Sequence, residues 1–376
     1  MSEQEGPRFG IDPYLDWIEA EGLIVHEDYG IYLTDVETQM WPRFGVPGAA
    51  VHCKGRGDFA SMFLFDIPAG GATEPMQHLF EKVVYVLEGS GSTQLEFEDG
   101  TKRSFEWGVG SMFAIPLNAQ YRHFNGSGVN KARIVGTTNM PLIMNTFFND
   151  EFIFNTRFAF KERLGKEEYF DGAGDLHKVS AGKNMWETNF VPNLNDLELL
   201  PWNERGQGSS NIMFVLGNGL MHAHMSEVAV GTYKKAHRHM AGTHVMVVSG
   251  QGYSLMWFDE QQDYLRIDWK HGLAFPPAEK QMHQHFNTGA KPARYFATGV
   301  GSLKYPLFTA KRRTSGTLKD GKAAAVSLST KLGGDQIEYA DQDPYIHSLY
   351  KKELTASGVE LVLEDSEIPV QKDAAE

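Results

Sequence analysis

Five histidines within about fifty residues are the part of this chain whose types and spacing could do chemistry: His237, His239, His244, His283 and His285. Side chains alternate between the two faces of an extended strand, so His237 and His239 point the same way. A strand that returns about forty residues later brings His283 or His285 opposite them. Neutral imidazoles suit borderline divalent ions such as Fe, Mn, Ni, Cu, Co or Zn. The sequence therefore predicts a pocket of three or four histidines that holds one divalent ion per chain.

Composition limits the partners of such a site. The chain has 376 residues, 41% of them hydrophobic, and a formal net charge of −13, which repels phosphate backbones and anionic lipid. We expect two domains, a small-molecule substrate, and neither nucleic acid nor membrane as a partner. The acidic start lacks an apolar signal region, so a cytoplasmic location is the default expectation. Cys53 is the single cysteine, which excludes an internal disulfide and favours a buried, inert thiol.

An internal repeat organises the chain. Residues 83–92 resemble residues 244–253 at an offset of 161, and residues 123–126 resemble residues 285–288 at an offset of 162. A near-constant offset over the whole span indicates a tandem duplication. Each copy consists of short β-rich runs punctuated by Gly, Pro and Asn, which favours an all-β barrel or sandwich in each half.

These features together resemble the cupin superfamily, and two copies in one chain resemble the bicupins. The resemblance covers roughly residues 50–145 and 212–305, and it implies two tandem jelly-roll barrels with a metal at the mouth of one. The expected organisation is an N-terminal extension (1–50), a first barrel without metal (51–150), a connector (151–211), a second barrel with the metal site (212–310) and a C-terminal tail with a helix (311–376).

The cupin pattern assigns His237, His239 and His283 as metal ligands and normally adds a glutamate. This chain departs from the pattern there. Counting forward from His239 reaches His244, whereas counting back from Gly250 reaches Thr243. We favour His244 as a fourth ligand, because a one-residue bulge would rotate it inward. Without His244, a neutral three-histidine site remains, which resembles that of gentisate-type and β-diketone-cleaving cupin dioxygenases and lacks the carboxylate of the oxalate decarboxylase branch.

His285 lies on the same face as His283 and is the candidate catalytic residue, as an acid, a base or a group that orients substrate. The alternative is structural packing, since His123 persists at the matching place of the first copy. A further pair, His222 and His224, precedes the motif, and we favour a structural or interface role for it.

The first copy has lost the ligands. At the repeat offsets His237 corresponds to Met76, His239 to His78, His244 to Val83 and His283 to Tyr121. One histidine among Met, Val and Tyr cannot hold a catalytic divalent ion, so the first barrel is expected to be a packing partner.

The ends of the chain predict helices. A short amphipathic helix is expected to begin after Asp12, and another near residues 345–354. The basic triplet 311–313 and the Gly/Lys/Ala/Ser stretch up to Lys331 indicate a mobile tail. A tail of this kind usually wraps a partner subunit or stays solvated, and we expect a homo-oligomer.

Two functional classes follow. The first is an Fe(II) dioxygenase that cleaves a C–C bond of a small metal-chelating hydroxy-carboxylate, aromatic or diketone, because neutral ligands leave the ion its charge and open positions. The second is a non-redox lyase, isomerase or decarboxylase in which the metal polarises the substrate and His285 moves a proton. A non-catalytic binding protein is a weaker third alternative.

Overall fold

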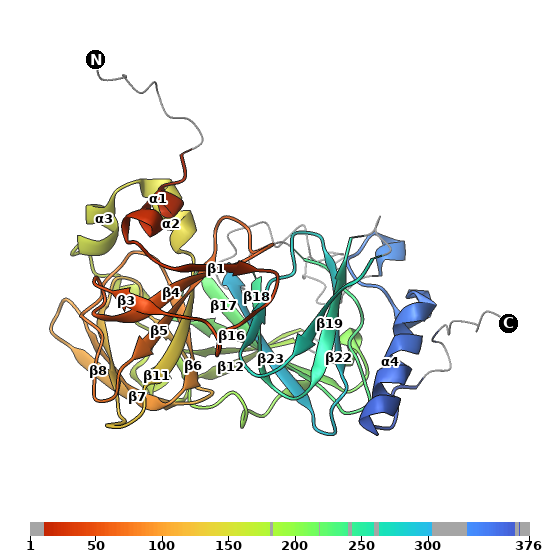
Figure 1. The fold of residues 1–376 in the computed structure, drawn as a ribbon. Helices are drawn as coiled ribbons and strands as arrows, with labels where there is room; N and C mark the ends of the chain where they lie inside the picture. The colour runs from red at the N-terminus through yellow and green to blue at the C-terminus, as the bar shows by residue number, and fades with distance from the viewer. Residues whose placement is uncertain are drawn as a thin grey trace, which may run out of the picture.

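The computed structural model describes residues 11–180, 183–217, 219–239, 243–258, 263–302, 329–364 and 368. Figure 1 shows two β-rich halves side by side, with helices at the two outer ends. The fold is all-β, and the predicted pair of tandem jelly-roll barrels with short helical extensions is confirmed. The boundaries given above for the five segments stay predictions.

The first barrel consists of a large and a small sheet. The large sheet has the order β1-β4-β5-β11-β6-β9-β14, with β3 on β4, and the small sheet has the order β10-β7-β8. The strands of the large sheet are β1 (Val25–Asp28), β3 (Gln39–Trp41), β4 (Val46–Cys53), β5 (Ser61–Ile67), β6 (Lys82–Glu88), β9 (Met112–Ile115), β11 (Ala132–Thr138) and β14 (Phe190–Val191). Those of the small sheet are β7 (Ser90–Glu96), β8 (Lys102–Gly108) and β10 (Gln120–Asn125).

The second barrel repeats this plan. Its large sheet has the order β12-β13-β16-β17-β23-β18-β21-β2, with β15 on β16, and its small sheet has the order β20-β19-β22. The large sheet comprises β2 (Ile31–Tyr32), β12 (Asp175–Ser180), β13 (Lys183–Thr188), β15 (Leu200–Pro201), β16 (Ser209–Leu216), β17 (Met221–Val228), β18 (Thr243–Ser249), β21 (Leu273–Phe275) and β23 (Ala293–Val300). The small sheet comprises β19 (Gly252–Trp257), β20 (Leu265–Trp269) and β22 (Met282–Asn287).

Helices cover the outer ends. They are α1 (Pro13–Ala20), α2 (Met140–Phe147), α3 (Asp150–Asn155) and α4 (Pro344–Ser357), with short 3₁₀ turns at Lys161–Arg163, Glu167–Phe170, Asn203–Arg205, Thr330–Leu332 and Tyr339–Asp341. The carboxylate of Asp12 accepts from Leu15 N and begins α1, and that of Asp343 accepts from Tyr345 N and begins α4. Both predicted helices are confirmed. The basic triplet and most of the predicted mobile stretch lie outside the described residues. No helix in the described ranges has the length and apolar character needed to cross a membrane.

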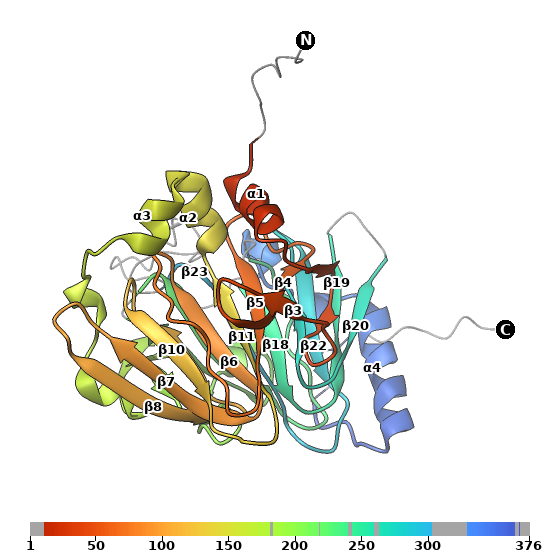
Figure 2. The ribbon, with the colours of Figure 1, turned by 60° about the vertical axis from the view of Figure 1, so that its left-hand side comes forward.

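The two large sheets pack against each other, and strict alternation decides which side chains meet there. On β5, Phe63 and Phe65 belong to the core of the first barrel, whereas Met62 and Leu64 belong to the core between the barrels. On β18, Val245 and Val247 line the interior of the second barrel, and Met246 and Val248 face the first. The two halves in Figure 2 therefore share one apolar interface.

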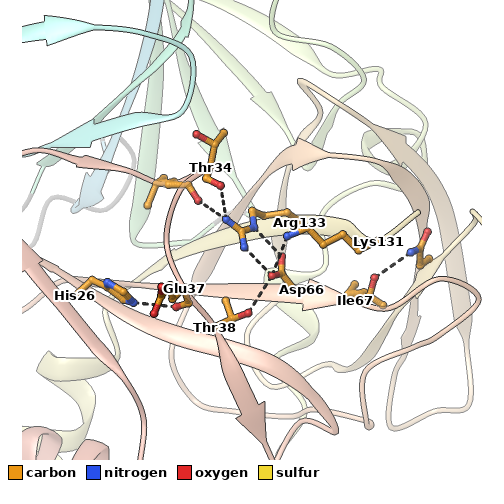
Figure 3. A network of polar contacts seen from close by, with 10 residues as sticks. His26, Thr34, Glu37, Thr38, Asp66, Ile67, Lys131 and Arg133 are labelled. Carbon is orange, nitrogen blue, oxygen red and sulfur yellow. Dashed lines mark hydrogen bonds and ion pairs between the residues drawn. The ribbon is translucent and has the colours of Figure 1, made fainter. Parts of the chain in front are cut away.

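Each half also contributes a short strand to the large sheet of the other half. Strand β2 pairs with β21 of the second barrel, and β14 pairs with β9 of the first. Arg133 holds the segment that follows β2. Its guanidinium bonds both carboxylate oxygens of Asp66 at 2.7 Å and donates to the carbonyls of Leu33 and Thr34 at 3.0 and 2.7 Å (Figure 3). Arg294 does the same in the second half, with Glu227 and the carbonyls of residues 194, 195 and 197. The duplication thus extends beyond the barrels to the segments that Arg133 and Arg294 hold.

Candidate metal centre

Three of the predicted ligands come together inside the second barrel. His237 and His239 lie on the segment between β17 and β18, and His283 lies on β22. The ring of His283 has its centroid 4.2 Å from that of His237 and 4.7 Å from that of His239. One ring nitrogen of each histidine lies within 4.8 Å of those of the other two. The three imidazoles are therefore close enough to share one ion.

The surroundings lower the pKa values of His237 and His283 and orient the ring of His283. Burial, followed by the charge of Arg205, holds the pKa of His237 well below its usual range. Burial and the neighbouring His239 do the same for the pKa of His283. Nδ1 of His283 lies 3.2 Å from the carbonyl of Gln281. Because a carbonyl only accepts, that nitrogen carries the proton and Nε2 keeps the lone pair that a metal requires.

His244 is not part of this group. The alternation along β18 is unbroken from Thr243 to Val247, so Thr243 faces the interior and His244 faces the first barrel. The pKa of His244 is lowered to about 3 by burial, and the next causes are Arg56 and His52, both in the first half. The register shift between β18 and β23 falls between Val247 and Ser249, too far along the strand to turn His244. The expected inward rotation therefore does not occur.

His285 lies beside the three histidines, as expected, but outside their group. Its centroid is 5.5 Å from that of His283 and 4.6 Å from that of Tyr295. Trp269 Nε1 donates to Ser254 Oγ at 2.9 Å, and Ser254 Oγ lies 2.8 Å from His285 Nδ1. The Ser254 hydroxyl, which accepts from the indole, thus holds His285 at Nδ1, and Nε2 of His285 is the ring nitrogen away from Ser254.

The first barrel contains the same series of contacts from a tryptophan through a hydroxyl to a histidine, which we call the relay. Trp107 Nε1 donates to Thr93 Oγ1 at 3.0 Å, and Thr93 Oγ1 lies 2.7 Å from His123 Nδ1. The relay therefore belongs to the duplicated scaffold. What differs in the second barrel is its neighbour, the three-histidine group.

The pair His222 and His224 faces the same interior, which the sequence analysis did not anticipate. On β17 the residues Met221, Ala223 and Met225 pack between the barrels, so the two histidines point to the other side. The two rings are stacked with centroids 6.3 Å apart. The pKa of His224 lies well below its usual range, first because of burial and then because of neighbours that include Lys234 and His239. This pair therefore lies on the interior side of β17, with His239 among the neighbours of His224.

Two cations also approach the site, and sequence reasoning missed both. Lys234 is 2% exposed, and its ammonium lies 5.1 Å from the centroid of Tyr295. Arg205, from the connector, is among the charges that lower the pKa values of His237 and His283. Lys234 could have been noted, since it precedes His237 by three residues. Nothing in the sequence around Arg205 signals its position.

The ligand positions of the first barrel hold a different cluster. Lys82, which matches Thr243 in the repeat, donates to Tyr121 Oη at 2.6 Å, and Tyr121 Oη lies 2.8 Å from His78 Nε2. His78 Nδ1 lies 2.7 Å from the carbonyl of Phe80. Burial lowers the pKa of Lys82 to about 7. When protonated, a lysine at this place opposes a divalent ion by charge, and the absence of a metal from the first barrel stays a prediction.

Comparisons with known proteins give no sequence relative: no family model matches the chain, and no curated protein does. Among solved structures, a variant of Bacillus subtilis oxalate decarboxylase has 12% identity and a TM-score of 0.48, over 88% of this chain and 94% of that one. Lactobacillus farciminis oxalate decarboxylase in a formate complex has 11% identity and a TM-score of 0.48, over 81% and 95%. Vicilin from Solanum lycopersicum has 11% identity and a TM-score of 0.46, over 73% and 85%.

Proposed function

We propose that this chain is a metal-dependent bicupin enzyme that binds one divalent ion at His237, His239 and His283. The favoured activity is that of an Fe(II) dioxygenase that cleaves a C–C bond of a small, metal-chelating acid, aromatic or diketone. The observation that carries this proposal is the three-histidine group itself, which includes no carboxylate from the described residues. Three neutral ligands leave the ion its full charge and leave positions for an anionic chelating substrate and oxygen.

The ion, when bound, would polarise the substrate and, if it is iron, supply the redox chemistry of oxygen. The protein contributes orientation and protection from water. Trp269, Phe275 and Tyr295 surround His285 with ring centroids 5.6, 6.2 and 4.6 Å away, so aromatic rings hold that imidazole in place. His285, held at Nδ1 by Ser254, would contact a substrate oxygen through Nε2.

A non-redox decarboxylase, lyase or isomerase is the second candidate, and the same relay favours it. A histidine held at Nδ1 by a serine hydroxyl can exchange a proton with the substrate at Nε2: the neutral ring takes a proton from carbon, and the resulting imidazolium returns it to a carbanion or enolate carbon. Neither class needs a carboxylate ligand. They differ in whether oxygen is consumed.

Elemental analysis of protein purified without added metal, followed by an oxygen-electrode screen, separates the two. The panel contains hydroxy-carboxylates, catechol-like acids and diketones. Iron at one equivalent per chain, with one oxygen consumed per substrate, supports the dioxygenase. Manganese, zinc or nickel with equal turnover in the absence of oxygen supports the second class. The His283→Ala variant should lose both metal and activity, while the matched first-barrel variant Tyr121→Phe should keep both.

A further inference from the structure

We propose that Lys234 and Arg205 form an anion-binding subsite beside the three histidines, and that the substrate carries two acidic groups. One group would chelate the ion, and the other would bind the ammonium of Lys234. The anion-binding subsite depends only on Lys234 and Arg205, whereas a substrate with two acidic groups rests on the function proposed above.

The ammonium of Lys234 has no anionic partner among the residues that the structure describes. Its nearest acid in electrostatic terms is Glu227, but Arg294 Nε already bonds that carboxylate at 2.6 Å. Glu227 also projects from β17 with Met225, toward the other barrel and away from the pocket. The face of Tyr295 at 5.1 Å compensates only part of the lost hydration. Burial and the neighbouring Arg205 lower the pKa of Lys234 to about 7, so the side chain is only partly protonated at neutral pH, and a ligand that brings a counter-ion would favour its charged form.

Arg205 lacks a carboxylate partner as well, within the described part of the chain. Its guanidinium donates to Gln336 Oε1 at 3.1 Å and lies 5.3 Å from the ring of Trp202. The acids nearest to it, Asp335 and Glu338, are bonded by Arg238 and Lys235. Burial lowers the pKa of Arg205 to about 10, which leaves it charged at neutral pH. Arg205 is therefore a charged partner for an anion, and Lys234 beside it would become fully charged as the anion binds.

The first barrel provides an internal comparison. Lys234 N donates to the carbonyl of His285 at 2.9 Å, and Thr73 N donates to that of His123 at 2.9 Å, so Thr73 occupies the matching position. By the same pattern of backbone bonds, from Lys235 N to Arg205 O and from Glu74 N to Phe44 O, Phe44 matches Arg205. The half without the ligand histidines thus has a neutral and an apolar residue there. The two cations occur together with the three-histidine group.

The geometry separates the two acidic groups of the substrate. The ring centroids of His283 and His285 are 5.5 Å apart, and those of His285 and Tyr295 are 4.6 Å apart. The ammonium of Lys234 lies over the Tyr295 ring. The three-histidine group is therefore a neighbour of His285, and the ammonium is a neighbour of the Tyr295 ring that contacts His285. A small diacid can reach both, and His285 would lie beside the bonds that connect its two ends.

Isothermal titration calorimetry on metal-loaded full-length protein tests this with malonate, succinate and glutarate, each paired with the monoamide of the same length. The amide removes one charge and keeps the size. We expect at least one diacid to bind roughly 10- to 100-fold more tightly than its monoamide. The second carboxylate of the diacid forms a charged hydrogen bond with Lys234, whereas the amide forms a bond in which the ligand group is neutral. In Lys234→Met that ratio should fall to about one with metal content unchanged, and Lys234→Arg should restore part of it.

Lys82→Met, which removes the buried lysine of the first barrel, is the matched control and should leave the ratio as in wild type. Equal binding of acid and monoamide at all three lengths, or an unchanged ratio in Lys234→Met, overturns the subsite. Protein that retains no metal yet still discriminates acid from monoamide would instead reject the metal-dependent function and keep the subsite. Failure of one proposal is therefore distinguishable from failure of the other.

Discussion

His237 and His283 are joined by two backbone hydrogen bonds, from His237 N to His283 O at 3.0 Å and from His283 N to His237 O at 2.9 Å. Met76 and Tyr121 form the same pair in the first barrel, with both bonds at 2.8 Å. The duplication therefore preserved the backbone that brings two ligand positions together, whereas only the second copy has imidazoles on it. Because this backbone pair does not depend on a metal, the site is arranged before the ion arrives.

We predict one metal ion per chain. His237→Ala, His239→Ala and His283→Ala should each reduce bound metal to below about a tenth of an equivalent, since two histidines hold a divalent ion weakly. Elemental analysis of each purified variant measures this. His78→Ala and His123→Ala are the matched controls and should retain the full equivalent. Two equivalents in wild type, or loss of the ion from His78→Ala, would contradict the assignment.

His244 should be dispensable for the ion. The side chain is fully buried and neither ring nitrogen has a hydrogen-bond partner among the described residues. Replacing it with leucine removes two unsatisfied polar atoms, so His244→Leu should be as stable as wild type or more stable by about 1 to 3 kcal/mol. Urea unfolding and metal content measure the two effects. Loss of the ion in His244→Leu would restore it as a ligand.

The His244 and Thr243 ambiguity shows where sequence reasoning reached its limit. The repeat and the all-β fold followed from spacing, because strand alternation and duplication are visible along the chain. Spacing left either His283 or His285 opposite His237 and His239, and the resemblance to the cupins selected His283. The facing of His244 depends on where a bulge falls, and the bulge lies at Val248, after the residue in question. Arg205 reaches the three-histidine group through tertiary packing of the connector, which has no periodic signal in the sequence, whereas Lys234 lies three residues before His237 and could have been noted.

Acid should destabilise the folded chain through its buried histidines. Burial lowers the pKa of His52 to about 4, and those of His123 and His244 to about 3. The unfolded chain takes up these protons near pH 6.5, so stability is complete above that pH and is lost as the pH falls toward 4 and 3. Each histidine contributes a slope of about 1.4 kcal/mol per pH unit in that window.

His244→Leu isolates one of these protons. Its free energy of unfolding should fall less steeply than that of wild type between pH 6 and pH 4.5, by about 1.4 kcal/mol per pH unit. Urea titrations at several pH values provide the comparison. Parallel curves for the two proteins would show that His244 does not titrate as its burial requires.

His285 should matter for turnover and little for metal. His285→Ala leaves the three candidate ligands in place, so it should keep most of its ion and lose activity by roughly two to four powers of ten if the ring transfers a proton. Ser254→Ala, which removes the hydroxyl at Nδ1, should show a smaller loss and a shifted pH profile. Metal analysis and initial rates measure these effects, and full activity in His285→Ala would leave only the structural role that His123 has in the first barrel.

Gln336 should act on the anion subsite without touching the substrate. Its side chain accepts from Arg205 Nη1 at 3.1 Å and donates to the carbonyl of Glu204 at 3.1 Å, and its backbone forms a bridge with that of His237. Gln336→Ala keeps the backbone bridge and releases the guanidinium, so the metal should stay while the diacid loses about tenfold in affinity. Calorimetry with succinate and its monoamide reports the change.

Gln77→Ala, a similar truncation in the first barrel, is the control. The amide of Gln77 bonds Asn118 and the carbonyl of Thr156, far in sequence from the second barrel. If Gln336→Ala lowered the affinities for the acid and the monoamide equally, its effect would be a general loosening of the pocket, and Arg205 would not depend on it for its position.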